Sequence, residues 1–222
     1  KVYWPLNRNG VRTPSRQERR GDEDAAPSGP QVLPGTYKVV AVWGKFKDSS
    51  SVTVKSDPRL NVKLDDLKAK DAAFLDMEKV VKKATEGFDQ LKEARNTIRR
   101  VDAALATAPD STKQRLAKLG KALQDSLNVL EQLYMEPEDV KGIQRNENNL
   151  SSALQRAQQY MNASDGAPNQ GAQRMMAKAR QQTTEVLNRI NNFFAGKFVD
   201  YRKQVEAVQY SLFSAYVPVK VE

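Results

Sequence analysis

The chain has 222 residues, of which 39% are hydrophobic, and 36 Lys and Arg residues outnumber 27 Asp and Glu residues to give a formal net charge of +9. It contains no His and no Cys. This composition excludes disulfides, Cys-based zinc sites and Ser-His or Cys-His catalysis within the chain. We therefore expect a protein that is not an enzyme, with no catalytic residues, no metal site and no cofactor.

The positive charge is concentrated near the N-terminus. Residues 1–63 hold 12 basic against 6 acidic side chains, whereas residues 64–222 hold 24 against 21. A run of arginines can bind phosphates, but no nucleic-acid motif stands beside this one and three acids follow it directly. We favour a weakly ordered loop over residues 16–28 and keep nucleic-acid binding as an alternative; the run is Arg8, Arg12, Arg16, Arg19 and Arg20.

The sequence also bears on whether the chain spans a membrane and whether it is part of a longer protein. No apolar run reaches the roughly 18 residues that a membrane span needs. The chain opens directly on the strand-like residues 2–4, with neither a signal peptide nor an initiating Met. We expect a piece of a larger protein whose targeting signal lies elsewhere.

Residues 1–60 are predicted to form a small, partial antiparallel β module. Residues 1–6 alternate weakly between apolar and polar, and residues 7–35 form a long basic loop rich in Arg, Pro and Gly. Residues 37–43 and 51–55 have the β-branched and aromatic content of strands. About three strands are too few for an immunoglobulin- or fibronectin-like sandwich of about seven, so the rest is missing or lies upstream.

From Leu64 the hydrophobic period changes from two to about 3.5, which predicts a helix over residues 64–107 that ends before Pro109. Such heptads can form a coiled coil between chains, but partner helices follow in this chain, so we favour packing within it. The two heptad series are Leu67, Phe74, Val81 and Phe88, and Met77, Ala84, Leu91, Ile98 and Leu105.

Three further helices are predicted over residues 111–135, 146–162 and 170–210. Ser111 and Gln114 match a capping box at the start of the first of these. Residues 61–222 should therefore fold as an antiparallel bundle of three to four helices. Its inward residues are Leu116, Leu119, Leu123, Leu127, Leu130 and Leu133 or Tyr134 on the first helix, Leu150, Leu154, Ala157 and Met161 on the second, and Met176, Ala179, Thr183, Val186, Ile190, Phe193, Phe194, Tyr201, Val205 and Val208 on the third.

Two clusters of acidic residues are candidates for a calcium site or a catalytic pair. Asp22, Glu23 and Asp24 lack the regular oxygen spacing and central Gly of a calcium loop, so a solvated loop is favoured. The second group flanks Pro137 between two predicted helices, where a helix cap is favoured over a catalytic pair; it consists of Glu136, Glu138 and Asp139.

Three aromatic residues are a candidate sugar-binding platform. Trp4, Tyr37 and Trp43 lie in or near predicted strands. They can form a platform that stacks on sugar rings, but aromatic side chains on short strands more often fill a small core. We favour the core and assign no site residues.

Residues 32–37 (VLPGTY) and 51–59 (SVTVKSDPR) carry a resemblance, to which residues 3–7 (YWPLN) add a Trp-containing strand. They resemble the C-terminal region of large exported bacterial proteins with sortilin-like or Asp-box (BNR) β-propellers. In that family these motifs belong to an immunoglobulin- or fibronectin-like domain with a helical tail. The resemblance implies a secreted or periplasmic accessory region, and no family catalytic residue falls on this chain.

The favoured function is therefore a non-catalytic C-terminal accessory, spacer or protein-interaction module of a larger exported protein. Its partner is expected to be the upstream β-propeller of the same polypeptide or another protein, in the periplasm or outside the cell. One alternative is a non-catalytic part of a glycoside hydrolase-like β-propeller protein that assists glycan processing. The second is nucleic-acid binding through the Arg-rich loop.

Overall fold

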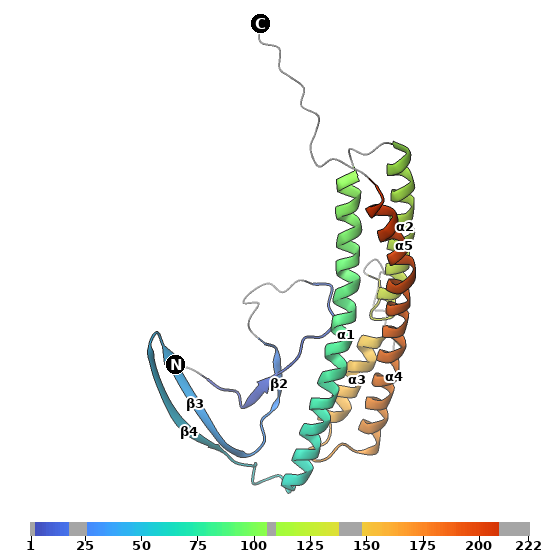
Figure 1. Cartoon of the computed structure of the whole chain (residues 1–222). Helices are drawn as coiled ribbons and strands as arrows, with labels where there is room; N and C mark the ends of the chain where they lie inside the picture. The colour runs from blue at the N-terminus through green and yellow to red at the C-terminus, as the bar shows by residue number, and fades with distance from the viewer. Residues whose placement is uncertain (1–2, 18–25, 106–109, 138–147, 209–222) are drawn as a thin grey trace. The chain divides into compact units, whose positions relative to one another are not determined.

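A computed structural model describes residues 3–17, 26–105, 110–137 and 148–208 (Figure 1). Its described part is a set of helices preceded by a small antiparallel β module, which confirms the predicted fold class. The helices are α1 (Leu64–Ala104), α2 (Asp110–Gln132), α3 (Leu150–Asn162), α4 (Gln170–Phe193) and α5 (Val199–Glu206), with the π-helical turn η2 (Phe194–Phe198) between the last two.

The strands form two separate two-stranded sheets, β1 (Asn7–Asn9) with β2 (Ser28–Gln31) and β3 (Gly35–Trp43) with β4 (Phe46–Val54). The prediction of about three strands in one sheet is therefore wrong. So is the prediction of an irregular loop over all of residues 7–35, because β1 and β2 lie within it. Neither strand shows the alternation that marks a half-buried strand.

The predicted strand over residues 1–6 is also wrong for its described part, residues 3–6. Leu6 has a φ of 58°, a left-handed conformation that interrupts an extended chain. The Trp4 side chain bridges this turn, with Nε1 donating to the Asn7 carbonyl at 3.1 Å. The extended pairing therefore begins only at Asn7.

The predicted helix boundaries need small corrections. The helix expected to end at residue 135 ends at Gln132, and the helix expected over residues 170–210 contains the turn η2 and ends at Glu206. Asn169 caps α4, because its Oδ1 accepts a hydrogen bond from the Ala172 amide at 2.9 Å. Residues 106–107, 146–147 and 209–210 of the predicted helices lie outside the described part of the chain.

The heptad prediction for α1 is confirmed by burial. Phe88, Leu91 and Ile98 are fully buried, whereas Leu67 and Val81 are half-buried. Most of the inward residues predicted on the later helices are also buried, and Tyr134, not Leu133, is the buried one of that pair. The prediction is wrong for Leu119, Phe194, Val205 and Val208, which are only half-buried.

The chain packs as two compact units. One contains residues 1–85 and 151–182, and the other contains residues 86–150 and 183–222. A division into a β domain over residues 1–60 and a helical domain over residues 61–222 stays a prediction.

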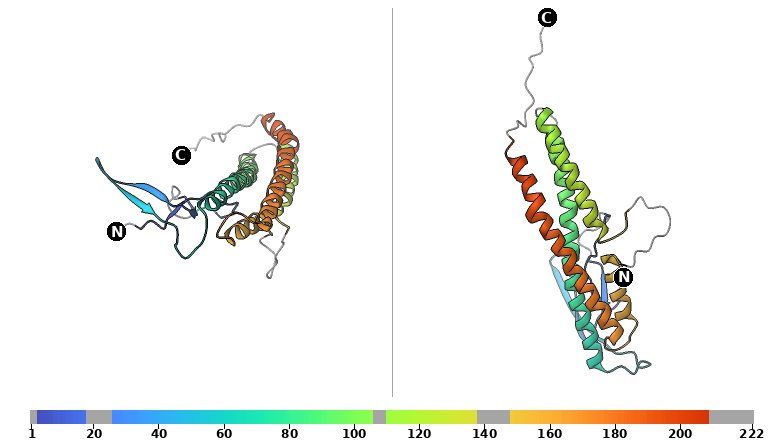
Figure 2. Two further views of the ribbon diagram at one scale, coloured as in Figure 1. Left: turned by 90° about the horizontal axis from the view of Figure 1, so that it is seen from below. Right: turned by 90° about the vertical axis from the view of Figure 1, so that its right-hand side faces the viewer.

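In the first unit, α3 lies beside the N-terminal half of α1 (Figures 1 and 2). The β1–β2 pair is fastened to α1 in two places. Arg8 Nη1 contacts Glu78 Oε2 at 2.6 Å, and the Thr85 hydroxyl donates to the Arg12 carbonyl at 2.8 Å. We call residues 7–14 and 27–31 the strap, because together they are tied to the helix surface by these contacts.

In the second unit, a core of aromatic and aliphatic side chains joins α1, α2 and α4. The rings of Phe88 and Tyr134 meet edge to face with centroids 5.0 Å apart. A Cβ on Gly87 would lie 2.5 Å from Leu187 Cδ2 and 2.8 Å from the Tyr134 hydroxyl oxygen. The absence of a side chain at Gly87 thus allows these helices to approach closely.

Candidate functional site

The long hairpin of β3 and β4 is the first candidate surface. Nine residue pairs form its ladder, from Gly35 opposite Val54 to Trp43 opposite Phe46. The two-residue turn Gly44–Lys45 joins the strands, and Gly44 takes a φ of 56° that glycine adopts without steric cost. Figure 1 shows the two strands running side by side as a long hairpin.

The two faces of this hairpin differ in chemistry. Directly opposed residues of an antiparallel pair lie on the same face, so the register assigns each side chain. One face, which we call the apolar face, contains Tyr37, Val39, Ala41, Trp43, Phe46, Val52 and Val54, together with Asp48 and Ser50. The opposite face contains Lys38 and Lys47, Thr and Ser residues, and also Val40 and Val42.

The apolar face is uncovered along most of its length. Trp43 is 84% exposed and Phe46 is 66% exposed, and almost every other residue of both strands is exposed. Near the base of the hairpin, Trp4 packs edge to face on Tyr37 at 5.4 Å, and the Tyr37 hydroxyl donates to the Leu33 carbonyl at 2.6 Å. Large exposed aromatic residues on a regular sheet mark an interaction surface.

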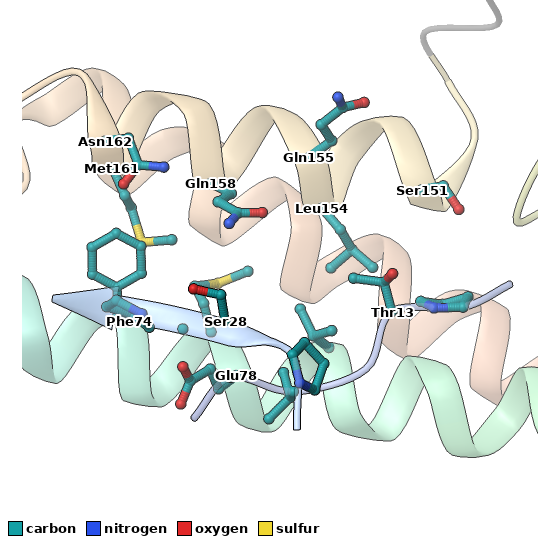
Figure 3. Close-up of a pocket in the computed structure, with 18 residues that line it drawn as sticks. Thr13, Ser28, Phe74, Glu78, Ser151, Leu154, Gln155, Gln158, Met161 and Asn162 are labelled. Carbon is teal, nitrogen blue, oxygen red and sulfur yellow. The ribbon is translucent and has the colours of Figure 1, made fainter. Parts of the chain in front are cut away.

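The second candidate is a cavity of about 520 Å³ in the first unit, between the strap and helices α1 and α3 (Figure 3). Its floor is apolar, with Phe74 and Met77 from α1 and Leu154 and Met161 from α3. Figure 3 shows Leu154 and Gln158 extending from α3 toward the strap. Neither the strap nor this cavity is apparent from the periodicity of the sequence.

The predicted aromatic platform is not assembled. Tyr37 and Trp43 lie six residues apart on β3, about 20 Å at the rise of an extended strand. Trp4 contacts Tyr37 and not the tip of the hairpin. The favoured interpretation, a small core, is also wrong, because Trp4 is 38% exposed, Trp43 lies on the exposed surface and Tyr37 is only half-buried.

The arginine run is only partly available to phosphates. Arg8 lies between two carboxylates of α1, with Nε 3.4 Å from Asp71 Oδ1 and Nη1 2.6 Å from Glu78 Oε2. The predicted weakly ordered segment 16–28 lies largely outside the described residues, as do Arg19 and Arg20. Arg8 thus fastens the strap to α1.

The acidic groups supply no assembled site in the described chain. Asp22, Glu23 and Asp24 lie outside it, as do Glu138 and Asp139, and Glu136 is half-buried. No three Asp or Glu side chains of the described residues converge as metal ligands. Nor does any described helix have the length and apolar content to cross a membrane.

Two buried phenols lie in the second unit. Burial raises the pKa of Tyr134, and burial together with the charge of Asp102 raises the pKa of Tyr201 to about 12. Neither hydroxyl has a hydrogen-bond partner among the described residues. Groups with such pKa values stay protonated at neutral pH, so they offer packing and not acid–base chemistry.

Comparison with known proteins identifies no relative. No family model matches the chain, and no curated protein or solved structure matches it either.

Proposed function

We propose that the chain is a non-catalytic accessory module of a larger exported protein, and that the β3–β4 hairpin is its docking element. The observation that carries this proposal is the exposed apolar face. An isolated two-stranded hairpin is marginal in water and gains stability when its apolar face is covered. The partner surface is an apolar sheet of the upstream β-propeller region of the same polypeptide, or of another protein.

The chemistry of the hairpin supports packing on a sheet. The apolar face extends along both nine-residue strands of the hairpin. Among the described residues, no third strand pairs with the outer edge of β3 or of β4. Sheets that pack face to face bury alternate residues of each strand, which is the pattern of this face. The resemblance of residues 32–59 supports a periplasmic or extracellular location.

Quenching of Trp43 fluorescence tests this proposal. The chain contains two Trp residues, so replacement of Trp4 by Phe leaves Trp43 as the only reporter. Acrylamide should quench Trp43 strongly in this chain, and weakly in a polypeptide that is extended upstream through the β-propeller region. Equal quenching in both polypeptides, or a gene with no β domain upstream, would refute docking within the polypeptide.

A pair of double variants controls for the stability of the hairpin itself. Trp43→Ser with Phe46→Ser removes a cross-strand pair from the apolar face, whereas Val42→Ser with Lys47→Ser removes the neighbouring pair from the opposite face. In the extended polypeptide the first variant should lower the melting temperature and expose the hairpin to protease. The second should do so much less, and equal effects would contradict a role for the apolar face.

A further inference from the structure

The cavity beneath the strap has the size and lining of a ligand site that the docking proposal does not use. Its volume of about 520 Å³ lies within the usual range for pockets that hold small ligands. All its lining residues belong to the first compact unit. The strap above it is fixed by the Arg8 and Thr85 contacts with α1, so the cavity has a defined shape before any ligand binds.

The lining combines an apolar floor with uncharged hydrogen-bonding groups. Phe74, Met77, Leu154 and Met161 supply the floor, and methionine side chains adapt to ligands of varied shape. Figure 3 shows the Gln158 carboxamide and the Ser28 hydroxyl on opposite sides of the space, from α3 and from the strap. A carboxamide and a hydroxyl both donate and accept, which matches the amide groups of a peptide backbone.

The charges of the described lining disfavour anionic ligands. Among the residues that the structure describes, no Lys or Arg lines the cavity, so phosphates and carboxylates find no cationic partner among them. Glu78, the one charged residue in the described lining, already contacts Arg8 at 2.6 Å.

We propose that this cavity binds an uncharged peptide segment in extended conformation. An aliphatic side chain of the peptide packs against Leu154 and Met161, and its backbone amides bond to Gln158 and Ser28. This site is separate from the apolar face of the hairpin and needs no upstream domain. A failure of either proposal therefore leaves the other standing.

Titration with the capped tripeptide N-acetyl-Ala-Leu-Ala-methylamide tests the site in this chain. Two-dimensional amide NMR should show saturable shifts confined to the strap, the first half of α1 and α3. Inorganic phosphate and the capped tripeptide Ala-Asp-Ala should give no saturable shift there. Absence of saturation by the neutral peptide, or tighter binding of either anion, would overturn the proposal.

Two adjacent glutamines of α3 provide a matched control. Gln158 lines the cavity and Gln159 does not, and both side chains are exposed. Gln158→Leu should weaken binding about fivefold, the usual effect of losing one hydrogen bond, whereas Gln159→Leu should leave it unchanged. Leu154→Phe should fill the floor and abolish binding, with the helical circular dichroism signal checked for folding. Equal affinity in all three variants would place the peptide elsewhere.

Discussion

At the scale of single residues, the clearest feature is how closely α1 approaches its neighbours at Gly87. A methyl group there would meet Leu187 and the Tyr134 hydroxyl at distances shorter than normal contacts. The neighbouring Phe88 ring is fully buried against Tyr134. This part of the second unit is packed tightly enough for single-atom changes to affect the free energy of unfolding.

Replacement of Gly87 and of Gly196 by Ala should therefore have opposite effects. Gly87→Ala should destabilise the protein by about 1–3 kcal/mol, because the added methyl overpacks the core. Gly196 lies in η2 with nothing within 4 Å of an added Cβ, so Gly196→Ala should stabilise by about 0.5–1 kcal/mol through lower unfolded-state entropy. Urea denaturation measures both, and a stabilising Gly87→Ala would contradict this packing.

Removal of the Phe88 ring tests the same core by creating a cavity instead of overpacking it. Phe88→Ala should cost about 3–5 kcal/mol, the usual loss for a large buried side chain that leaves a cavity. The measurement is urea denaturation followed by circular dichroism. A cost below about 1 kcal/mol would mean that the heptad face of α1 is open to solvent.

Tyr201 provides a test by pH. A Cβ on Gly120 would lie 3.5 Å from both the Tyr201 hydroxyl and Asp102 Oδ1, so phenol and carboxylate are close. The pKa of Tyr201 is raised in the folded state, to about 12, so its contribution to stability is complete below pH 10 and is lost as pH rises from 10 to 12.

The urea concentration at the midpoint of unfolding of the parent protein should thus decrease as the pH rises from about 10 to about 12. Tyr201→Phe should show a smaller fall, because it lacks the ionising hydroxyl, and should be equally stable at pH 7. A variant whose midpoint falls as steeply as that of the parent would show that this phenol is not shielded from water in the folded state.

At the scale of elements, the strap and the hairpin differ in how they are held. The strap is tied to α1 by the Arg8 ion pairs and by Thr85, whose buried hydroxyl lies 2.8 Å from the Arg12 carbonyl and 2.9 Å from the Val81 carbonyl. The strands β3 and β4 are held chiefly by their own ladder and by the Trp4 contact at the base. The strap is thus part of a compact unit, and the hairpin presents a surface.

Removing the Thr85 hydroxyl should loosen the strap. Thr85→Val keeps the shape of the side chain but loses the bond to the Arg12 carbonyl, at a cost of about 0.5–1.5 kcal/mol. Amide hydrogen exchange over residues 7–14 should accelerate. Thr97→Val is the control, because the Thr97 hydroxyl contacts only Glu93 and Arg100 within α1. Unchanged exchange in Thr85→Val would mean that the ion pairs alone hold the strap.

At the scale of the whole molecule, the net charge of +9 is the property most easily mistaken for a function. Charge alone supports non-specific association with polyanions, and a basic run strengthens it. Here Arg8 already has Asp71 and Glu78 as partners, and three acids follow Arg20 in the sequence. We therefore expect weak electrostatic contact with nucleic acid and no dedicated site.

A salt titration tests this expectation. If five arginines each neutralised a phosphate, the association constant for duplex DNA would fall as the salt concentration rises. A plot of log association constant against log salt concentration would have a slope of about −4 to −5. We expect no tight binding at low salt and none at physiological salt. Tight binding with that slope, abolished by combined replacement of Arg16, Arg19 and Arg20 with Ala, would show that this run is a binding arm.

The sequence by itself determined the helices and their buried faces, and it did so because the signal is local. Residues such as Phe88, Leu91 and Ile98 recur at the spacing of one helix face, and a helix needs only its own hydrogen bonds and one apolar stripe. The strands over residues 37–43 and 51–55 were predictable for a similar reason, since β-branched and aromatic content marks them directly. The start of the second strand was not predicted: β4 begins at Phe46, so the ladder runs over nine pairs up to a two-residue turn.

Only the tertiary structure decided what lies between these elements. The strands β1 and β2 pair across nearly 20 residues, and contacts of Arg8 with Asp71 and Glu78 about 65 residues away hold one of them in place. No local pattern encodes such contacts. The cavity arises in the same way, because its walls come from four segments of the chain that meet only when it folds. The exposure of Trp43 is likewise a tertiary fact: alternation shows which face is apolar, and only folding shows whether anything covers it.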